Sequence, residues 1–398
     1  MNKKAKLRFV GMTEYRLEEL FDLQMGKTPT RNNPEYWTSK DHKWISIGDL
    51  SKCGKYISET KEYLSDKAVK DSGISLIPAE TVVMSFKLSI GKTAITAEPM
   101  YSNEAIMSFH NRHLVDLLPD YVYYLLSGRD WDEGTNKAVM GKTLNKATLS
   151  RIKVKIHGIE QQRKIVSVLD NISSIIDTRQ QQLATLDNLI KARFVEMFGD
   201  PVLNEKGWET RPFLDMGSCK NGMSFHYEDS GVELNCLGVG DFKDYSVITN
   251  TELLPTVSLN EMPSEEYLLR DDDIVFVRSN GNKALVGRSV AVYPGDTPTS
   301  FSGFCIRYRK HDDDITIPYL LRVLKTDSIR KKMAGRGANI QNLNQQILGT
   351  LIIPVPPLDL QNQFAEFVEQ VDKSKAVIQK SLDETQLLFD SLMQEYFG

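Results

Sequence analysis

Three Gly-Lys-Thr triplets are the residues of this 398-residue chain that first suggest chemistry. They lie at 26–28, 91–93 and 141–143. A phosphate-binding P-loop ends in such a triplet, but it needs another glycine about five residues earlier, where the backbone wraps around the phosphates. Phe21, Phe86 and Asn136 occupy those places. The triplets therefore do not predict nucleotide binding.

Other chemistry-bearing residues are equally incomplete as sites. His110 and His113 have a spacing that suits metal ligands, but no third ligand lies near them in the sequence. Asn33-Pro-Glu-Tyr36 resembles the Asn-Pro-Pro-Tyr motif of amino-methyltransferases, but Glu35 replaces its third residue and no glycine motif for S-adenosylmethionine accompanies it. The acidic runs 271–273 and 312–314 are typical of solvated turns. We therefore predict no catalytic residue and no metal site.

Composition limits the class of protein. The chain has 41% hydrophobic residues, which is enough for packed cores, and its length predicts two or three domains. No apolar run approaches the ~18 residues of a membrane span, and the basic segment 1–10 lacks the apolar core of a secretory signal. Four cysteines are too scattered for a disulfide framework or a zinc site. These features favour a cytoplasmic, reduced protein.

The sequence repeats itself at half its length. Leu144-Asn145 returns as Leu343-Asn344, Gln162 as Gln361, and Phe198-Gly199 as Phe397-Gly398, each at an offset of 199 residues. Earlier matches, such as 45–50 with 237–242, have an offset of 192, as expected where loops differ in length. The chain is therefore a tandem duplication, in which a mixed domain and a long helix occur twice.

Each half begins with a strand-rich domain, residues 1–158 and 200–357. Short apolar runs at 81–86 and 273–277 predict strands, and frequent glycines predict turns between them. Helices are expected at 119–127 and 318–326, each opening with proline near its first position. We therefore expect two mixed α/β domains.

The segments 159–199 and 358–398 differ from these domains. The first 40 residues of the segment 159–199 contain neither Gly nor Pro, and Gly199 followed by Pro201 predicts the helix end. Apolar residues alternate at spacings of three and four, which indicates a heptad seam. Charged or polar residues interrupt the seam at Arg179, Arg193, Lys375 and Thr385. The predicted seam comprises Ile165, Leu169, Ile172, Ile176, Leu183, Leu186 and Ile190 in the first helix, and Phe364, Val368, Val371, Ile378, Leu382, Phe389 and Leu392 in the second.

A helix with such a stripe needs a partner, and the nearest one is its own repeat. We predict an α+β protein with two tandem mixed α/β domains, each followed by a long helix. The two helices would form an intramolecular antiparallel coiled coil with pseudo-two-fold symmetry. The alternative is that each helix packs only on its own domain, but 40 residues exceed what a domain of this size would cover.

With this organisation the chain resembles the DNA specificity subunits of type I restriction–modification enzymes. The series 26–30, 35–37 and 44–50 resembles the opening of a target-recognition domain in that family. Residues 159–165 and 356–364 resemble the family's Pro-Pro-Leu-x-Glu-Gln-x-x-Ile helix opening. His157-Gly158 replaces the two prolines in the first copy, and Gln161 and Leu360 replace the glutamate. The resemblance extends over essentially the whole chain.

The resemblance implies a non-catalytic role in a larger enzyme. Each target-recognition domain would read one half of a bipartite, asymmetric site in double-stranded DNA. The helices would set the gap between the halves and dock two methyltransferase subunits, and through these the motor–nuclease subunits. This chain would bind no cofactor, whereas the partner subunits would use S-adenosylmethionine, ATP and Mg. Alternatives are a coiled-coil scaffold for proteins, a subunit of a methyltransferase complex without nuclease, and a methyltransferase with its own cofactor site.

The net charge of −4 does not favour nucleic acid, but it is unevenly distributed. Along the domain, helix, domain and helix the charge is +5, 0, −4 and −5. Residues 134–158 carry six basic residues without an acid, and residues 328–357 carry four. Such local runs can neutralise phosphates whatever the total charge is.

Base reading requires side chains with suitable donors and acceptors, such as Asn and Gln for adenine and Arg and Lys for guanine. Gly-rich loops at 278–283 and 336–342 supply them, and the first half has candidates at similar positions. The predicted DNA-binding residues are Lys27, Arg31, Lys87, Ser89, Lys92, Lys142, Asn145 and Lys146 in the first half, and Lys220, Asn221, Arg278, Asn280, Asn282, Lys283, Arg288, Arg336, Asn339, Gln341 and Asn342 in the second.

Overall fold

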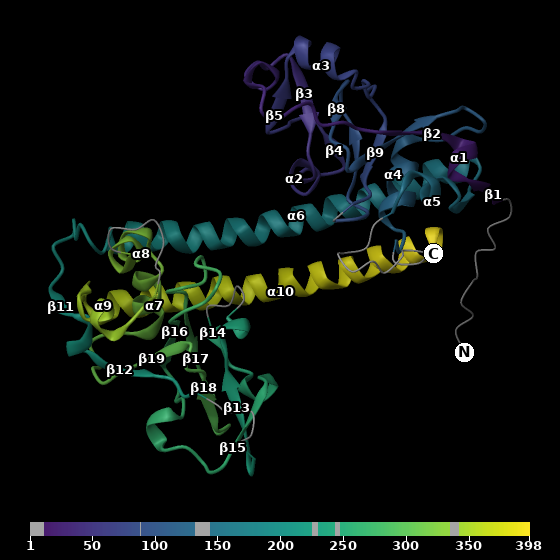
Figure 1. The fold of residues 1–398 in the computed structure, drawn as a ribbon. Helices are drawn as coiled ribbons and strands as arrows, with labels where there is room; N and C mark the ends of the chain where they lie inside the picture. Colours follow the sequence, from purple (N-terminus) through teal and green to yellow (C-terminus); the bar gives the residue numbers. More distant parts are fainter. Residues whose placement is uncertain (1–11, 88, 132–143, 225–229, 243–246, 335–341) are drawn as a thin grey trace, which may run out of the picture. The chain divides into compact units, whose positions relative to one another are not determined.

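A computed structural model describes residues 12–87, 89–131, 144–224, 230–242, 247–334 and 342–398 (Figure 1). The chain forms two compact units. Unit 1 comprises residues 1–180 together with 380–398, and unit 2 comprises residues 181–379. Each unit therefore contains one of the two expected mixed domains and a part of both long helices.

Unit 1 is built on a five-stranded sheet in the order β2-β9-β6-β7-β4. A three-stranded sheet, β5-β3-β8, and the antiparallel pair β1-β10 accompany it. Its strands are β1 (Thr13–Arg16), β2 (Phe21–Met25), β3 (His42–Ile45), β4 (Tyr56–Ile57), β5 (Glu62–Leu64), β6 (Val82–Ser85), β7 (Thr93–Thr96), β8 (Tyr101–Ser102), β9 (Ile106–Asn111) and β10 (Lys153–Ile156). The expected strand at 81–86 is β6, which is buried along its whole length.

Unit 2 repeats this topology strand for strand. Its sheets have the orders β12-β19-β16-β17-β14, β15-β13-β18 and β11-β20. The strands are β11 (Thr210–Pro212), β12 (Gly217–Asn221), β13 (Val232–Leu237), β14 (Val247–Ile248), β15 (Thr256–Leu259), β16 (Asp273–Val277), β17 (Ser289–Val292), β18 (Thr299–Phe301), β19 (Cys305–Lys310) and β20 (Ile352–Pro354). The duplication inferred from the sequence is therefore a duplication of the fold.

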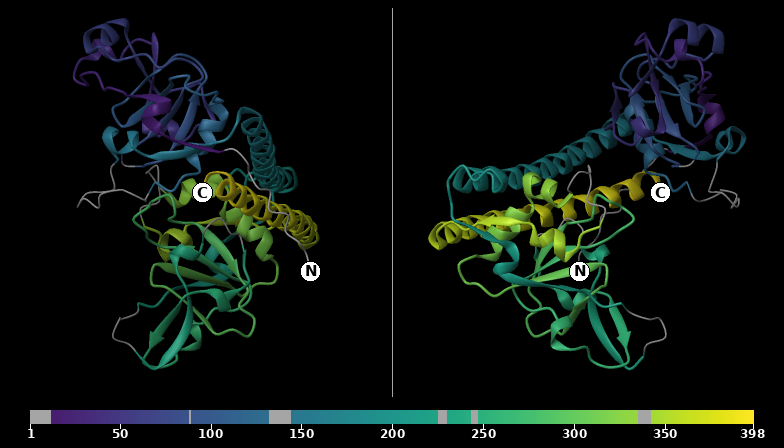
Figure 2. Two further views of the ribbon diagram at one scale, coloured as in Figure 1. Left: turned by 90° about the vertical axis from the view of Figure 1, so that its right-hand side faces the viewer. Right: turned by 60° about the vertical axis from the view of Figure 1, so that its left-hand side comes forward.

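Short helices cover the sheets and connect the strands (Figure 2). Pro119 opens α4, as predicted, and its equivalent α7 begins one residue before Pro318. The short helices are α1 (Leu17–Leu20), α2 (Ile47–Leu50), α3 (Asp66–Ser72), α4 (Pro119–Ser127), α5 (Lys146–Ser150), α7 (Ile317–Leu324), α8 (Asp327–Ala334) and α9 (Gln345–Gly349), with single turns η1 (Pro34–Tyr36), η2 (Phe213–Asp215), η3 (Val239–Asp241), η4 (Thr251–Leu253) and η5 (Glu265–Tyr267).

The two predicted long helices are α6 (Ile159–Phe198) and α10 (Leu358–Phe397), each 40 residues long. Gly199 ends α6 with a φ of +77°, a left-handed conformation that glycine adopts without steric cost. In unit 1 the start of α6 packs with the end of α10, and in unit 2 the end of α6 packs with the start of α10. The helices are therefore antiparallel in both units, as predicted.

The apolar face of the helix pair differs in part from the predicted seam. Ile165, Leu169 and Phe364 are buried as expected. Phe194, Phe198 and Met393, which the heptad pattern omitted, are buried as well. Phe194 and Phe198 contact the rings of Tyr319 on α7 and Phe364 on α10, so a spacing of four residues turns this part of α6 toward the domain core. The buried face of each long helix therefore contacts a domain as well as the partner helix.

The repeated glutamine explains how each long helix joins its domain. Gln162 is completely buried, and its Nε2 donates to the carbonyls of Asp116 and His157, while its Oε1 accepts the N–H of Leu118. Gln361 makes the corresponding three bonds, to the carbonyls of Asp314 and Pro356 and from the N–H of Thr316. These bonds satisfy backbone groups that would otherwise be buried without partners.

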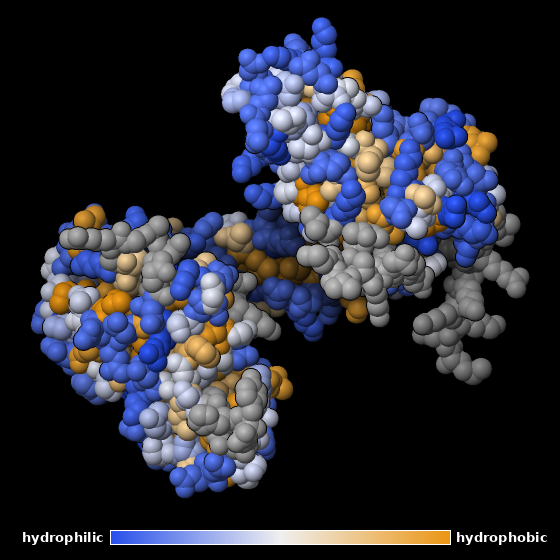
Figure 3. Space-filling model, in the orientation of Figure 1, coloured by the Kyte–Doolittle hydropathy of each residue, from blue (hydrophilic) through white to orange (hydrophobic). Residues whose placement is uncertain are grey.

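The face seen in Figure 3 is largely hydrophilic, with separate hydrophobic patches on both units. Among the described residues, no helix combines the length and the apolar character needed to cross a membrane.

Candidate nucleic-acid interface

Four segments of unit 1 meet where the strands of the five-stranded sheet end on one side. They are the end of β2 with residues 26–27, the loop between β6 and β7, the turn between β8 and β9, and residues 144–146. The N–H of Lys27 donates to the carbonyl of Ser102 (2.8 Å), and that of Phe86 to Ala105 (3.0 Å). The N–H of Leu144 donates to the carbonyl of Phe86 (3.3 Å). These bonds hold the four segments together as one surface, which we name the first loop edge.

Unit 2 has the same four segments joined by the same backbone bonds. Met223 donates to Phe301 (3.2 Å), Arg278 to Phe304 (2.8 Å), and Leu343 to Arg278 (2.8 Å). We name residues 221–223, 278–288, 302–304 and 342–345 the second loop edge. The bonds also define equivalent positions, so that Lys27 corresponds to Met223, Phe86 to Arg278, and Ala105 to Phe304.

Close backbone approach explains a glycine at one position of both edges. A Cβ on Gly26 would lie 2.3 Å from the carbonyl oxygens of Ser102 and Asn103. A Cβ on Gly222 would lie 2.1 Å from the carbonyl oxygen of Ser302. The end of β2 or β12 can therefore reach the neighbouring turn only without a side chain.

Most of the described candidates in the first half lie on the first loop edge. Lys27, Lys87, Ser89 and Lys92 come from two of its segments. The ammonium of Lys27 donates to the carbonyl of Ser72, and that of Lys87 lies 5.2 Å from the ring centre of Phe86. Both cations are therefore held near the edge by contacts within the unit.

Asn145 has a structural role that its sequence position did not reveal. Its Oδ1 accepts the N–H of Thr148 (2.8 Å) and caps α5. Asn344 caps α9 in the same way through Ile347 (2.8 Å). The repeated asparagine is thus explained by helix capping, while Lys146, the first residue of α5, is exposed beside it.

Arg31 is engaged within unit 1. Its guanidinium makes two bonds to the carboxylate of Glu62, at 2.5 and 3.1 Å. The same guanidinium lies 3.9 Å from the ring centre of Trp37 and 4.8 Å from that of Trp44. A phosphate contact by Arg31 would have to compete with this bidentate pair.

The second loop edge gathers most of the described candidates of the second half. Arg278 donates from Nη1 to the carbonyl of Gly303 (3.4 Å), which joins the loop 278–288 to the β18–β19 turn. Asn280 and Asn282 accept backbone N–H groups within their loop, at 2.7 and 3.1 Å, and Lys283 and Asn342 are exposed. The amide of Asn221 accepts from Gln345 (3.5 Å).

Two candidates of the second half are less exposed, Lys220 on β12 beside the second loop edge and Arg288 within it. Lys220 pairs with Glu266 (2.6 Å) and lies 4.5 Å from the ring centre of Tyr267, so its charge is partly compensated. Arg288 precedes β17 at the end of the long loop, half-buried near Arg330, whose guanidinium donates to Gly287 and Val286. Lys142, Arg336, Asn339 and Gln341 lie outside the described residues. DNA contact stays a prediction for all these side chains.

The sequence prediction rests on cations, amides and hydroxyls and therefore omits two residues of the loop edges. Glu104 lies on the first edge, and the hydrogen bond from Thr28 lowers the pKa of its carboxyl, which favours an ionised acceptor. Phe304 lies on the second edge with 63% of its surface exposed. A carboxylate can accept from the amino group of cytosine, and a phenyl ring can contact the thymine methyl.

The described residues contain no group of three or more His, Cys, Asp or Glu placed to hold a metal ion. Burial raises the pKa of the thiols of Cys53, Cys219, Cys236 and Cys305, which disfavours the reactive thiolate. His110 lies on β9 and contacts Ser108 (2.9 Å), whereas His113 is exposed.

Known proteins resemble this chain along both repeats. A specificity subunit of the type I restriction enzyme MjaIX from Methanocaldococcus jannaschii is 26% identical over 226 residues, which are 52% of this chain and 52% of that protein. The chain thus spans about half the length of this relative. The StySPI specificity subunit of Salmonella potsdam is 22% identical over 364 residues, covering 86% of this chain and 78% of the relative.

Solved structures share the fold. The S subunit of a type I restriction–modification system from M. genitalium has a TM-score of 0.55 at 14% identity, covering 100% of this chain and 99% of that one. A chain from a structure of the type I system has a TM-score of 0.57, with 98% of both chains covered and 14% identity. Residues 10–188 and 205–386 each match the type I restriction modification DNA specificity domain, and the chain therefore belongs to that family.

Proposed function

We propose that this chain is the DNA specificity subunit of a type I restriction–modification complex, in which each unit reads one half of a bipartite site. The observation that carries this proposal is the pair of loop edges. One backbone framework is built twice, and the side chains that it presents differ at equivalent positions. A duplicated scaffold with divergent contact residues suits two readers of different half-sites.

The differences between the edges are chemical. The first edge presents Lys27 and Glu104, where the second presents Met223 and Gly303. The second presents Arg278 and Phe304, where the first has Phe86 and Ala105. Since base edges are distinguished by donors, acceptors and the thymine methyl, such different sets would select different sequences. We therefore expect an asymmetric DNA site.

The long helices would set the gap between the half-sites and dock two methyltransferase subunits, through which motor–nuclease subunits would join. Several large apolar side chains on α6 and α10 support a docking role, because Ile175, Leu189, Val377 and Leu387 are between 45% and 71% exposed. S-adenosylmethionine, ATP and Mg would be used by those partner subunits.

An exchange of one domain tests this proposal. The chain is reconstituted with its methyltransferase subunit, residues 1–158 are replaced by the corresponding domain of a homologue, and methylated sites are mapped by sequencing. We expect one half-site to change while the other half and its methylation persist. A change in both halves, or methylation without sequence preference, would contradict the proposal.

A coiled-coil scaffold that binds only proteins is the main competing function. It predicts that the reconstituted complex has no preference among DNA sequences and no dependence of DNA binding on salt. Binding of S-adenosylmethionine by the isolated chain would instead favour a methyltransferase with its own cofactor site.

A further inference from the structure

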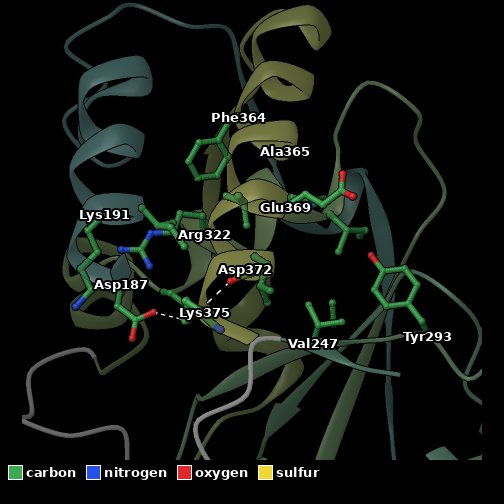
Figure 4. Close-up of a pocket in the computed structure, with 17 residues that line it drawn as sticks. Asp187, Lys191, Val247, Tyr293, Arg322, Phe364, Ala365, Glu369, Asp372 and Lys375 are labelled. Carbon is green, nitrogen blue, oxygen red and sulfur yellow. Dashed lines mark hydrogen bonds and ion pairs between the residues drawn. The ribbon is translucent and has the colours of Figure 1, made fainter. Parts of the chain in front are cut away.

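Unit 2 contains a pocket of about 470 Å³ between its parts of the two long helices, α7 and the sheet (Figure 4). Val247 and Tyr293 line it from the sheet side, and Phe364, Ala365 and Glu369 line it from α10. Its size is within the range of small-molecule sites, roughly 300–1,000 Å³. Further apolar lining residues are Ile190, Ala291, Ile317, Pro318, Leu321 and Val368.

The equivalent place in unit 1 can be identified from the repeat. Tyr121 on α4 and Tyr319 on α7 both donate to a carbonyl of the last strand of their domain, that of Lys155 (3.4 Å) and that of Pro354 (2.9 Å). Tyr124 therefore corresponds to Arg322, three residues further along each helix. Asp170 corresponds to Glu369 at the offset of 199. By position in the edge strands β4 and β14, Tyr56 corresponds to Val247.

In unit 1 aromatic side chains occupy this place. The hydroxyl of Tyr124 donates to Asp170 (2.5 Å), and that of Tyr56 donates to Asp120 (2.7 Å). Lys55 joins the two carboxylates at 2.5 and 2.6 Å. In unit 2 Val247 and Arg322 replace the two tyrosines, whereas Tyr293 stands where unit 1 has Ala97, so unit 2 has one phenol ring fewer at this place. The missing ring indicates what the pocket can accept.

The charges around the pocket indicate the polar group of its ligand. Asp187 and Asp372 lie 2.6 and 3.8 Å from the ammonium of Lys375, and Glu369 lies 2.6 Å from that of Lys373. The carboxylates in the lining thus have cationic partners. Arg322 has Asp187 and Asp327 as acidic neighbours, but its Nε is buried and has no hydrogen-bond partner among the described residues. Lys325 is a second cation of the lining, with Asp187 and Asp372 near it, and burial lowers its pKa to about 8.

We propose that this pocket binds a small aromatic molecule that carries one carboxylate. Its ring would occupy the place that Tyr56 fills in unit 1, and its carboxylate would face Arg322 and Lys325. The apolar lining would exclude water from the ring, and the guanidinium would gain an acceptor for a donor that is otherwise buried without one. The site is independent of the loop edges.

Binding of 4-hydroxyphenylacetate to the full chain, followed by saturation-transfer NMR and calorimetry, tests the proposal. We expect the wild type to bind it, and the double variant Val247→Tyr with Arg322→Tyr to bind at least ten-fold more weakly because its side chains refill the pocket. Lys331→Ala removes one exposed cation from α8 in the same unit and serves as the control, with unchanged affinity.

A second variant covers the case in which the double variant does not fold. Arg322→Gln should weaken 4-hydroxyphenylacetate at least five-fold but leave the affinity of the neutral analogue 4-hydroxyphenylethanol within two-fold. Affinity for the acid should also fall as the pH rises through about 8, where Lys325 loses its charge. No binding by the wild type at millimolar probe, or equal affinity of the wild type and the folded variants, would overturn the proposal.

Discussion

Phe304 shows how a single side chain can acquire a role from its backbone. It sits on a tight turn in which Gly303 donates to Met223 (2.6 Å) and Cys305 donates to Ser302 (2.8 Å). The turn therefore fixes the backbone that carries this exposed ring on the second loop edge. Isolated exposed apolar residues are common on protein surfaces, so exposure alone assigns nothing. Its position beside Arg278 gives Phe304 a specific expectation.

We predict that Phe304→Ala weakens binding of the reconstituted complex to its own DNA site about ten-fold or more, as the loss of one base contact does (~1–3 kcal/mol). Competition binding would measure the effect, and replacing thymine by uracil in the affected half-site should reproduce it. Leu253→Ala is the control, because Leu253 is 78% exposed on η4, outside the loop edge. Equal effects of the two variants would refute a base contact.

At the scale of elements, the sequence was most informative where apolar residues recur regularly and where Gly and Pro mark the helix ends. Helix α6 was predicted from 40 residues without Gly or Pro, and the duplication predicted α10. The burial of Phe194 and Phe198 was not predicted, because a heptad describes only the partner helix, whereas these rings also pack on Tyr319 of α7. The loop edges depend on backbone bonds between distant segments, which no local pattern reveals.

The packing of Phe194 leads to a stability prediction. Phe194→Ala should lower the free energy of unfolding by about 3–5 kcal/mol, since it removes a buried ring and leaves a cavity. Val195→Ala, on the adjacent residue that is 58% exposed, should change it by less than about 0.5 kcal/mol. Thermal unfolding of the two variants would measure the difference. Similar losses for both would contradict the packing of Phe194 on Tyr319 and Phe364.

The start of α6 should make the stability of unit 1 depend on pH. His157 is 4% exposed, its Nδ1 lies 2.8 Å from the hydroxyl of Tyr121, and burial lowers its pKa below 6.5. The unfolded chain therefore takes up this proton first as the pH falls, so stability is lost below about pH 6.5. His157→Pro introduces the residue that the second copy has at Pro356 and should reduce this loss. Parallel stability curves from pH 7.5 to 5 would contradict the assignment.

At the scale of the whole molecule, net charge is a poor guide to function because the domains and helices of this chain carry net charges of different sign. The acidic excess belongs to residues 200–357 and 358–398, whereas candidate phosphate-binding lysines lie on the first loop edge. Each phosphate contact changes the slope of log affinity against log salt concentration by about 0.9. The salt dependence therefore counts local contacts and is insensitive to distant acids.

Two matched double variants separate local from total charge. Lys92→Ala with Lys146→Ala and Lys373→Ala with Lys380→Ala each change the net charge from −4 to −6. The first pair lies on the loop edge, and the second pair is exposed on α10. We predict that the first pair lowers the magnitude of the salt slope by roughly 1–2, measured for the reconstituted complex on its own DNA site, whereas the second pair leaves it unchanged. If both pairs lower the salt slope equally, the total charge of the chain attracts the DNA and the loop edge has no special role. If neither pair lowers it, these lysines contact no phosphate.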